Sequence, residues 1–467
     1  MAELSEASRK HRTTINNLPE SLLLHILSFL MTLDTIKTSL VCRNWRYLWY
    51  QIPSLMFDIV PFHSPPYISL CIRPPSHLES FCLHVDCGDD LDIAIVVSWV
   101  LYAINSKVIE LDLDFNTSSL YYILVEENDE TVSEEFKFDF SHLKNSSVRH
   151  LRLSRSTICF PSSVSTSDFQ SIQSLDLCNL IISDSDVDQA VKSCVNLEYL
   201  AIQHCRVSNH LEIYSLKLKQ CHIGCVYPNS YMESSMLVIY APNLQIIHID
   251  DVLIKKCILK ESPDLVFAQV RYYHIVLLSY ESWCNLMSSL AYTKYLIVQN
   301  MYFGKAELLK LFDTEEDALQ CYKFKNLRHL QLLSGYTGNN VIGICSFLEH
   351  SHTLESLVIN YCDDSDEEDN NDEDSDEEDN DDEDNADEDI DDEEGVTEDY
   401  ISRPVTLHIP RLRHVTMNNY RGSQEELYIL GLLKIHQVVL EEVVAIPEQT
   451  GDTKLMPFPL WRASDCQ

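Results

Sequence analysis

Residues 15–52 read INNLPESLLLHILSFLMTLDTIKTSLVCRNWRYLWYQI, and this stretch decides how the start of the chain folds. Apolar residues recur at steps of three and four, which predicts a first helix that starts near Pro19 and ends before Met31. Asp34 is expected to cap a second helix, since a carboxylate can accept a hydrogen bond from a free backbone N–H group. Trp45 and Trp49 continue the apolar pattern into a third helix.

This segment holds more large apolar side chains than it can bury. A unit so small buries only about 60% of its unfolded surface, or less. Either the rest of the chain covers the surplus, as a helical cap on the next domain would require, or a second protein does. The residues that we predict to face a second protein are Leu18, Pro19, Leu23, Ile26, Leu27, Val41 and Trp45.

The patterns LP-x-x-L-L-x-x-I-L-S-F-L and T-S-L-V-C-R-x-W-R-Y-L-W resemble the F-box of plant F-box proteins, over residues 15–55. The resemblance implies docking on the Skp-type adaptor of a cullin-based (SCF) ubiquitin ligase, and through it on cullin and RING subunits. It also implies that the chain is a non-catalytic substrate receptor, whose remaining part holds a protein target. One departure is Cys42, where related sequences usually have serine.

Charge is the second unusual feature, at −39 for 467 residues. Between Asp363 and Glu394, 24 of the 32 residues are acidic and none is basic. A tract this polar cannot offset its ordering entropy, so 363–399 is predicted to be a disordered insertion in a surface loop. It is either a plain solvated tether or a polyanion that attracts basic proteins or weakly binds divalent cations. The sequence has no Lys/Arg cluster large enough to form a basic surface, so we expect no nucleic-acid partner.

Residues 107–362 contain strands of the form apolar-x-apolar, several introduced by phrases such as VNLEYLAI and KNLRHLQL. Spacings of 24, 25 and 27 fit leucine-rich repeats, while 40, 16 and 31 make the array irregular. Stacked repeats predict a curved parallel sheet whose concave face binds another macromolecule. The expected strands are Leu111/Leu113, Leu151/Leu153, Leu175/Leu177, Leu200/Ile202, Leu216/Leu218, Ile247/Ile249, Leu330/Leu332 and Leu357/Ile359, with one more at Leu296/Val298.

Three residues after the second apolar position, four of these units have a residue typical of leucine-rich repeats: Asn116, Cys205, Cys221 and Cys362. A zinc site is the alternative for the cluster His204, Cys205, Cys221, His222 and Cys225. Its spacing fits no usual zinc pattern, so we expect neither a metal nor another cofactor. The repeats, with SWVLYAINSKVIELDLDF as the first, resemble those of plant F-box/leucine-rich-repeat proteins.

Residues 400–455 contain a strand around Val415, a turn at 420–422, a helix from Glu425 to Leu433 and a strand at 438–444. Ser423 and Glu426 have capping-box spacing. The pattern strand, N-Y-R-G, E-E-L-x-x-x-x-L-L, strand resembles the FBD domain found at the end of many plant F-box/leucine-rich-repeat proteins. The helix end at 434–437 is shorter than in that family. We expect this block to cap the last repeat.

The remaining segments are a flexible N-terminus (1–14), a connector with a buried helix at Ile93–Ile104 (56–106) and a tail (456–467). An apolar run of that length is too short to cross a bilayer. Without a signal peptide, we expect thiols rather than disulfides, and a nuclear or cytoplasmic location. No G-x-S-x-G, P-loop or H-E-x-x-H motif indicates an enzyme.

The expected fold is α/β: a three-helix F-box, an irregular leucine-rich-repeat solenoid and an FBD-like cap. The expected function is substrate recognition for an SCF-type ligase. The alternative is a leucine-rich-repeat scaffold or small-ligand receptor that is not coupled to a ligase. The sequence does not identify the protein target.

Overall fold

The computed structural model describes residues 15, 18–41, 43–59, 77–87, 93–117, 137–161, 168–207, 210–228, 235–252, 254, 256–260, 262–272, 280–300, 323–335, 338–362, 407–435 and 442–447. The chain divides into two compact units, Met1–Asp264 and Leu265–Gln467. The predicted flexible N-terminus, acidic insertion and C-terminal tail lie outside the described residues.

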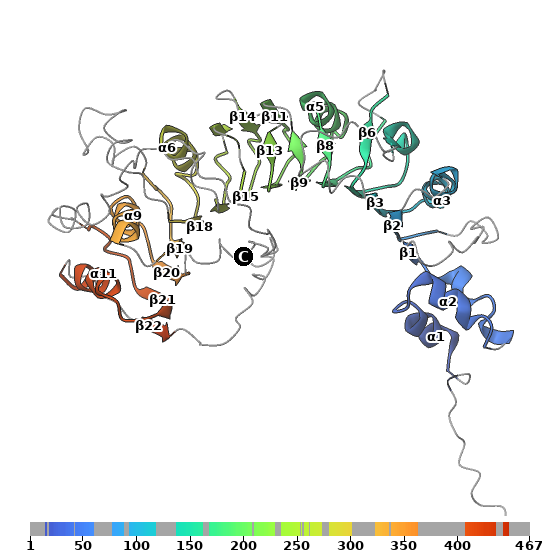
Figure 1. Cartoon of the computed structure of the whole chain (residues 1–467), viewed down its shortest axis with the longest axis horizontal. Helices are drawn as coiled ribbons and strands as arrows, with labels where there is room; N and C mark the ends of the chain where they lie inside the picture. The colour runs from blue at the N-terminus through green and yellow to red at the C-terminus, as the bar shows by residue number, and fades with distance from the viewer. Residues whose placement is uncertain are drawn as a thin grey trace, which may run out of the picture. The chain divides into compact units, whose positions relative to one another are not determined.

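The first unit opens with two α-helices and two short 3-10 helices: α1 (Glu20–Leu27), α2 (Thr32–Thr38), η2 (Arg43–Trp45) and η3 (Leu48–Gln51) (Figure 1). These two 3-10 helices lie where the sequence predicted a single third helix. The predicted cap at Asp34 is wrong, because α2 already begins after Met31, and Asp34 lies in its first turn. Asp34 instead forms an ion pair with Lys37, with an O–N distance of 2.8 Å.

A small apolar core holds these helices together. Its buried members are Leu23, Leu27, Trp45, Leu48, Trp49 and Ile52. A hydrogen bond ties this core segment to the strand that follows: the Met56 backbone N–H donates to Thr32 Oγ1 at 2.7 Å. The segment therefore has a core of its own and is anchored to the first strand.

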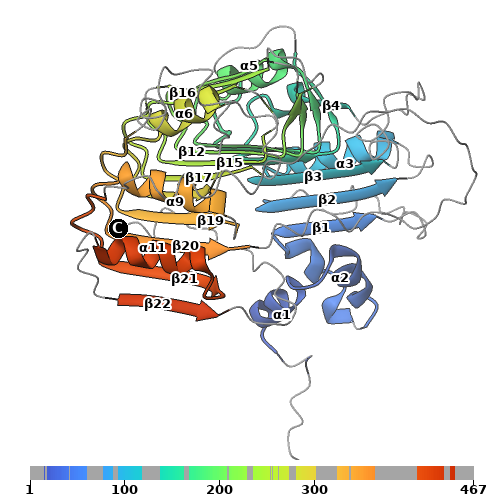
Figure 2. The same ribbon diagram turned by 60° about the vertical axis from the view of Figure 1, so that its left-hand side comes forward.

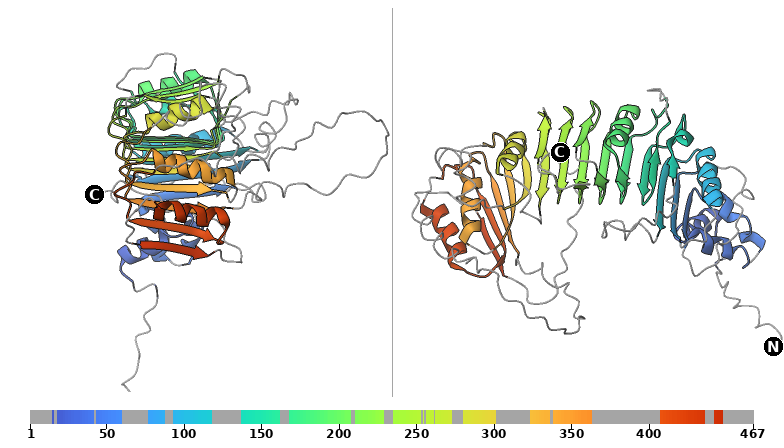
Figure 3. Two further views of the ribbon diagram at one scale, coloured as in Figure 1. Left: turned by 90° about the vertical axis from the view of Figure 1, so that its left-hand side faces the viewer. Right: turned by 45° about the horizontal axis from the view of Figure 1, so that its top comes forward.

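Parallel strands lie side by side after this segment, each hydrogen-bonded to the next (Figure 3). In spatial order they are β1 (Ser54–Ile59), β2 (Ser80–Cys87), β3 (Glu110–Thr117), β5 (His150–Ser154), β7 (Ser174–Cys178), β9 (Tyr199–Gln203), β12 (Gln220–Gly224) and β15 (Ile246–Asp250). The sheet thus begins earlier than the predicted start at 107, since β1 and β2 belong to it. Most of β1 and all of β2 lie in the segment that the sequence predicted to be a connector, 56–106.

Alternate side chains of each strand go to opposite faces of the sheet. Leu111 and Leu113 of β3 are buried, whereas Asp112 between them is only partly buried. Pairing keeps such residues in rows, because Leu111 aligns with Phe81 on one side and Leu151 on the other. One face is therefore apolar and covered, and the other is polar.

A second layer covers the apolar face (Figure 2). The helix that the sequence predicted at Ile93–Ile104 is α3. The centroid of its Trp99 ring lies 5.0 Å from that of the Phe57 ring of β1. The capping box that starts α5 is formed by Ser183 and Asp186. The layer comprises α3 (Ile93–Asn105), β4 (Lys137–Asp139), η5 (Phe140–Leu143), β6 (Thr157–Cys159), β8 (Ile181–Ile182), α5 (Asp184–Ser193), β10 (Arg206–Val207), β11 (His210–Tyr214), β13 (Tyr227–Pro228), β14 (Met236–Tyr240) and β16 (Lys256–Lys260).

The turn after each of five successive sheet strands contains a non-glycine residue in the left-handed region. These residues, with their φ angles, are Arg155 (53°), Asn179 (53°), His204 (52°), Cys225 (49°) and Asp251 (46°). In the first four, the backbone N–H donates to the carbonyl of the last residue of the following strand, at 2.7–3.1 Å. Each of these turns is therefore bonded to the next repeat.

The predicted strand at Leu216/Leu218 is wrong, and the strand there is β12. Leu216 is exposed, and Leu218 is buried in the loop that precedes β12. Leu197 has the equivalent position in the preceding repeat, just before β9. The leucine of the introductory phrase was thus mistaken for the strand itself. Cys221 is consequently a core residue of β12, aligned with Leu200, and not a turn residue.

The second unit also contains a parallel sheet with helices. Its elements are β17 (Phe267–Arg271), α6 (Tyr280–Ser289), β18 (Tyr295–Gln299), β19 (His329–Ser334), α9 (Gly338–Glu349), β20 (Ser356–Tyr361), β21 (His414–Tyr420), α11 (Gln424–Ile435) and β22 (Glu442–Pro447). The strands predicted at Leu296/Val298, Leu330/Leu332 and Leu357/Ile359 are confirmed as β18, β19 and β20. The sequence missed β17.

The predicted capping box of α11 is confirmed. The Ser423 backbone N–H donates to the Glu426 carboxylate at 2.7 Å, and the Arg421 N–H donates to both its oxygens at 3.2 Å. Glu426 is fully buried. Glu426→Ala should lower the free energy of unfolding of this unit by about 1–3 kcal/mol, because both donors lose their acceptor. Denaturant titration checks this, with Gln424→Ala as an exposed control on the same helix. If Glu426→Ala lowers the free energy of unfolding no more than Gln424→Ala does, the capping role of Glu426 is contradicted.

His350, buried in the same unit, should make its stability depend on pH. Its Nδ1 lies 2.6 Å from the Ser346 carbonyl oxygen. Burial lowers the pKa of His350 most. The hydrogen bond to Ser346 and the Glu349 carboxylate oppose this shift, and Lys323 and His352 add to it. As pH falls below about 6.5, the unfolded chain takes up a proton that the folded chain resists, so stability decreases.

The measurement is the unfolding free energy of the second unit at pH 7 and pH 5. His350→Gln should flatten the difference between the two values, whereas the exposed His352→Gln should leave most of it. If the unfolding free energy changes between pH 7 and pH 5 by as much in His350→Gln as in the wild type, His350 is not the cause of the pH dependence.

Of the helices described, none has the length and apolar character needed to cross a membrane. Ten cysteines in the described residues are free thiols. Cys284 of α6 is disulfide-bonded, which differs from the expectation that every cysteine is a thiol.

Candidate interaction surfaces

The helical segment at the start of the chain presents a set of large apolar side chains to solvent. Phe29 is 76% exposed and Leu40 is 86% exposed. We call this set the N-terminal apolar surface; it consists of Leu22, Ile26, Phe29, Leu30, Leu40 and Val41. The first four come from α1 and the turn after it, and the last two from the turn after α2. Large apolar side chains left exposed in such number in a short segment are typical of a protein-binding site.

Three of the seven residues that the sequence predicted to face a partner lie in the core. Leu23, Leu27 and Trp45 are only 5%, 1% and 6% exposed, so that part of the prediction is corrected. Leu23 and Leu27 lie one turn apart on the inner face of α1. The helical pattern alone does not say which apolar stripe faces inward.

The other four predicted residues remain available to a partner. Pro19, Ile26 and Val41 are exposed, and Leu18 is partly buried. Sequence reasoning did not choose Leu22, Phe29, Leu30 or Leu40. The spacing Leu22, Ile26, Leu30 marks a second stripe beside the core stripe, and this signal was present in the sequence.

The polar face of the first unit's sheet is the second candidate surface. Strand pairing aligns one row of residues across it: Met56, Cys82, Asp112, Arg152, Asp176, Ala201, His222 and His248. We call this the polar sheet face. Arg152 and His222 each have an acidic neighbour: Arg152 Nε lies 3.7 Å from Asp176 Oδ2, and His222 Nε2 lies 3.1 Å from Asp250 Oδ2.

The turn after β5 adds the most tightly held charge pair of this face. Arg155 donates two hydrogen bonds to the Asp114 carboxylate, at 2.7 and 2.6 Å. Burial raises the pKa of the Asp176 carboxyl, and the Arg152 guanidinium beside it acts in the opposite direction. The face therefore presents charges in fixed positions, which suits selective recognition of another charged surface.

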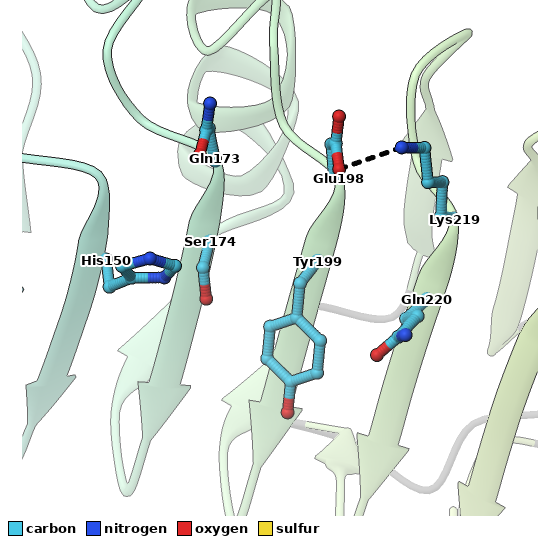
Figure 4. A pocket seen from close by; sticks show the side chains of 7 residues that line it. All are labelled: His150, Gln173, Ser174, Glu198, Tyr199, Lys219 and Gln220. Atoms are coloured by element: carbon cyan, nitrogen blue, oxygen red, sulfur yellow. Dashed lines mark hydrogen bonds and ion pairs between the residues drawn. The ribbon is translucent and has the colours of Figure 1, made fainter. Parts of the chain in front are cut away.

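A hollow of about 340 Å³ lies at the start of the central strands (Figure 4). Its lining residues are His150, Gln173, Ser174, Glu198, Tyr199, Lys219 and Gln220. Lys219 Nζ forms an ion pair with Glu198 at 2.9 Å. Burial, and secondly the Asp176 carboxylate, raises the pKa of Tyr199 to about 12, so its hydroxyl stays protonated. An aromatic ring beside hydrogen-bonding groups can receive a side chain of a docked protein.

The cysteines and histidines considered for zinc do not form one cluster. His204 and Cys225 are turn residues with positive φ, while Cys205 and Cys221 are buried. His222 points to the polar sheet face, where Gln203 Nε2 lies 2.6 Å from its Nδ1. Within the described residues, a different group has donor atoms close together: Cys82, His84 and Asp112.

Comparison with known proteins matches both parts of the chain. Residues 15–55 match the F-box domain, and residues 77–386 match the LRR domain described as At1g61320/AtMIF1. In Arabidopsis thaliana, the putative F-box/LRR-repeat protein At3g18150 is 30% identical over 45% of this chain and 42% of its own length. F-box/LRR-repeat protein 13 is 27% identical over 55% of this chain and 56% of its length.

The F-box/FBD/LRR-repeat protein At3g26920, also from Arabidopsis thaliana, is 24% identical over 61% of this chain and 62% of its own length. The chain thus spans about half the length of the curated relatives it matches. The LRR match alone covers more than half of the chain. With its strand array and N-terminal helical segment, the chain belongs to the plant F-box/leucine-rich-repeat family.

Proposed function

We propose that this protein is the substrate-recognition subunit of an SCF-type ubiquitin ligase. It docks on a Skp-type adaptor through the N-terminal apolar surface and holds a protein target on the polar sheet face. The observation that carries the proposal is the exposure of Phe29, Leu40 and Val41 beside a complete small core. The segment does not need these side chains for its own folding, yet leaving each of them exposed to water costs free energy.

The apolar chemistry of this surface suits a stable protein partner. Aromatic and aliphatic side chains that become buried at an interface centre supply most of the binding energy. Phe29 is well placed for this role because its ring already packs edge-on against His25, with centroids 4.9 Å apart. A ring that is held in position loses less freedom on binding than a mobile one.

The mechanism that follows is positional. Holding a target beside the ubiquitin carrier raises the effective concentration of the two reactants and lowers the entropic part of the barrier. The chain contributes binding and orientation, and the transfer chemistry belongs to other subunits. The FBD-like cap and the expectation of a nuclear or cytoplasmic location stay predictions within this proposal.

A protein target is favoured over a small ligand by the open form of the hollow. Pockets that bind small ligands enclose most of the ligand's surface. Here, Ser174, Gln220 and the Lys219–Glu198 pair line the hollow, and the side chains stand along neighbouring strands of one sheet (Figure 4). Side chains arranged along one sheet contact one side of a partner and do not enclose it.

The direct test is reconstitution of the purified full chain with a purified Skp-type adaptor. A one-to-one complex on gel filtration, which then recruits cullin, is the expected result. No complex at micromolar concentrations of both proteins would reject the ligase role and leave a binding scaffold.

Target recognition is tested separately by proximity labelling in plant cells. Tyr199→Ala with Lys219→Glu should remove a subset of labelled proteins while adaptor labelling stays unchanged, because these side chains are far along the chain from the F-box. Lys192→Glu, an exposed site on α5, serves as the matched charge-reversal control. An unchanged set of labelled proteins would exclude the hollow as the target-binding site.

A further inference from the structure

Two neighbouring strands bring three metal-binding side chains together on the polar sheet face. Cys82 and His84 are two residues apart on β2, so both side chains go to the same face. Asp112 of β3 is the residue aligned with Cys82. The sheet therefore sets their spacing.

Two of the three separations between donor atoms are close to those around a tetrahedral zinc ion. Cys82 Sγ lies 3.4 Å from His84 Nε2 and 3.8 Å from Asp112 Oδ2, and all three donor atoms lie within 4.8 Å of one another. Zinc bonds to sulfur at about 2.3 Å and to nitrogen or oxygen at about 2.0–2.2 Å, so its ligand atoms stand about 3.6 Å apart. Little rearrangement is needed for an ion to bind.

A second observation concerns the Asp112 carboxylate. Asp112 Oδ1 is buried and accepts no hydrogen bond from any described residue. A buried carboxylate oxygen without a partner is costly, and a bound cation would offset that cost. His84 is exposed, which gives the ion a path from solvent.

The surrounding charges allow a divalent cation. Asp58 aligns with His84 on one side, and Asp114 aligns with it on the other. Of the nearest positive groups, Arg155 binds Asp114, while Arg152 pairs with Asp176 and also lies beside Asp112, the residue with which it aligns. Acidic groups thus outnumber basic ones around the three donors.

We propose that Cys82, His84 and Asp112 bind one zinc ion, leaving a fourth position for water or for a donor side chain of a docked protein. Sulfur, nitrogen and oxygen donors together suit Zn²⁺, whereas Mg²⁺ and Ca²⁺ prefer oxygen alone. The site is separate from the F-box and stands or falls independently of adaptor docking.

The experiment uses the full chain after chelation and dialysis. Zn²⁺ is titrated against a chromophoric chelator, and Co²⁺ is used as a spectroscopic probe. A site containing Cys82 should give tetrahedral Co²⁺ bands and a thiolate-to-cobalt charge-transfer band that Zn²⁺ abolishes. The acidic tract 363–394 can bind divalent ions weakly, but it has no thiol and cannot give the charge-transfer band.

Cys82→Ser, His84→Gln and Asp112→Asn should each weaken Zn²⁺ binding by more than about tenfold, and Cys82→Ser should also remove the charge-transfer band. Cys362→Ser, which changes an exposed thiol elsewhere, should alter neither result. Circular dichroism confirms that each variant is folded. A charge-transfer band that survives in Cys82→Ser, or the absence of any such band in wild type, would overturn the proposal and leave a thiol–imidazole–carboxylate hydrogen-bond network.

Discussion

Replacing Ile26 and Phe29 together by aspartate is expected to abolish complex formation with the Skp-type adaptor while the chain stays folded. Both side chains are exposed, so the charges cost the free protein little. At an apolar interface each would be buried without a partner, which typically costs 2 kcal/mol or more per hot-spot residue. The dissociation constant should therefore rise by about a thousandfold or more. Isothermal titration calorimetry with purified adaptor measures this change.

The control is Lys37→Glu, a charge change at an exposed residue of α2 that is not a member of the apolar set. It should shift the dissociation constant by less than about threefold, because an exposed ion pair contributes little. If Ile26→Asp/Phe29→Asp binds the adaptor as tightly as Lys37→Glu does, the docking surface lies elsewhere on the chain.

Leu27→Ala should have the second largest effect, by a different route. Leu27 is 1% exposed in the core with Trp45 and Trp49. Removing its methyl groups should cost about 2–5 kcal/mol, which is enough to unfold a segment with so small a core. Adaptor binding then falls in proportion to the unfolded fraction, although Leu27 does not contact the adaptor.

A stabilising osmolyte separates the two routes. Leu27→Ala should recover adaptor binding in the osmolyte, with a parallel recovery of tryptophan fluorescence. Ile26→Asp/Phe29→Asp should not recover. Leu22→Ala is the matched exposed leucine on α1, and it should weaken binding without changing protease resistance. A Leu27→Ala chain that is stable yet fails to bind would mean that Leu27 itself contacts the adaptor.

The repeat architecture could be predicted from the sequence because its signal is a period. Leu111/Leu113 and Leu330/Leu332 lie in strands as expected, since alternating apolar residues cannot face the core in any other register. The prediction failed where two leucines competed, as at Leu218, which precedes the strand that Cys221 occupies. β2 was missed because a proline-rich stretch precedes it and interrupts the pattern.

The two surfaces were less accessible to sequence reasoning. Helical spacing identified an apolar segment, but Leu22 and Leu23 are adjacent in sequence and only the fold decides which is buried. Likewise, Cys82 and Asp112 are thirty positions apart. They become neighbours through a strand alignment that the irregular repeat lengths conceal.

The left-handed turns tie each repeat to the one that follows it. Arg155, Asn179, His204 and Cys225 each hold a backbone conformation that L-residues disfavour, at a cost of about 1 kcal/mol apiece. Each of their N–H groups is bonded to the strand that follows, never to the one before. Loss of a later repeat therefore removes the acceptor that holds its predecessor's turn. Loss of an earlier repeat removes the acceptors at the start of its successor's strand, such as the Arg149 carbonyl that accepts from Gln173 and Ser174. Each inner repeat is thus held from both sides, and unravelling should proceed inward from the ends of the array.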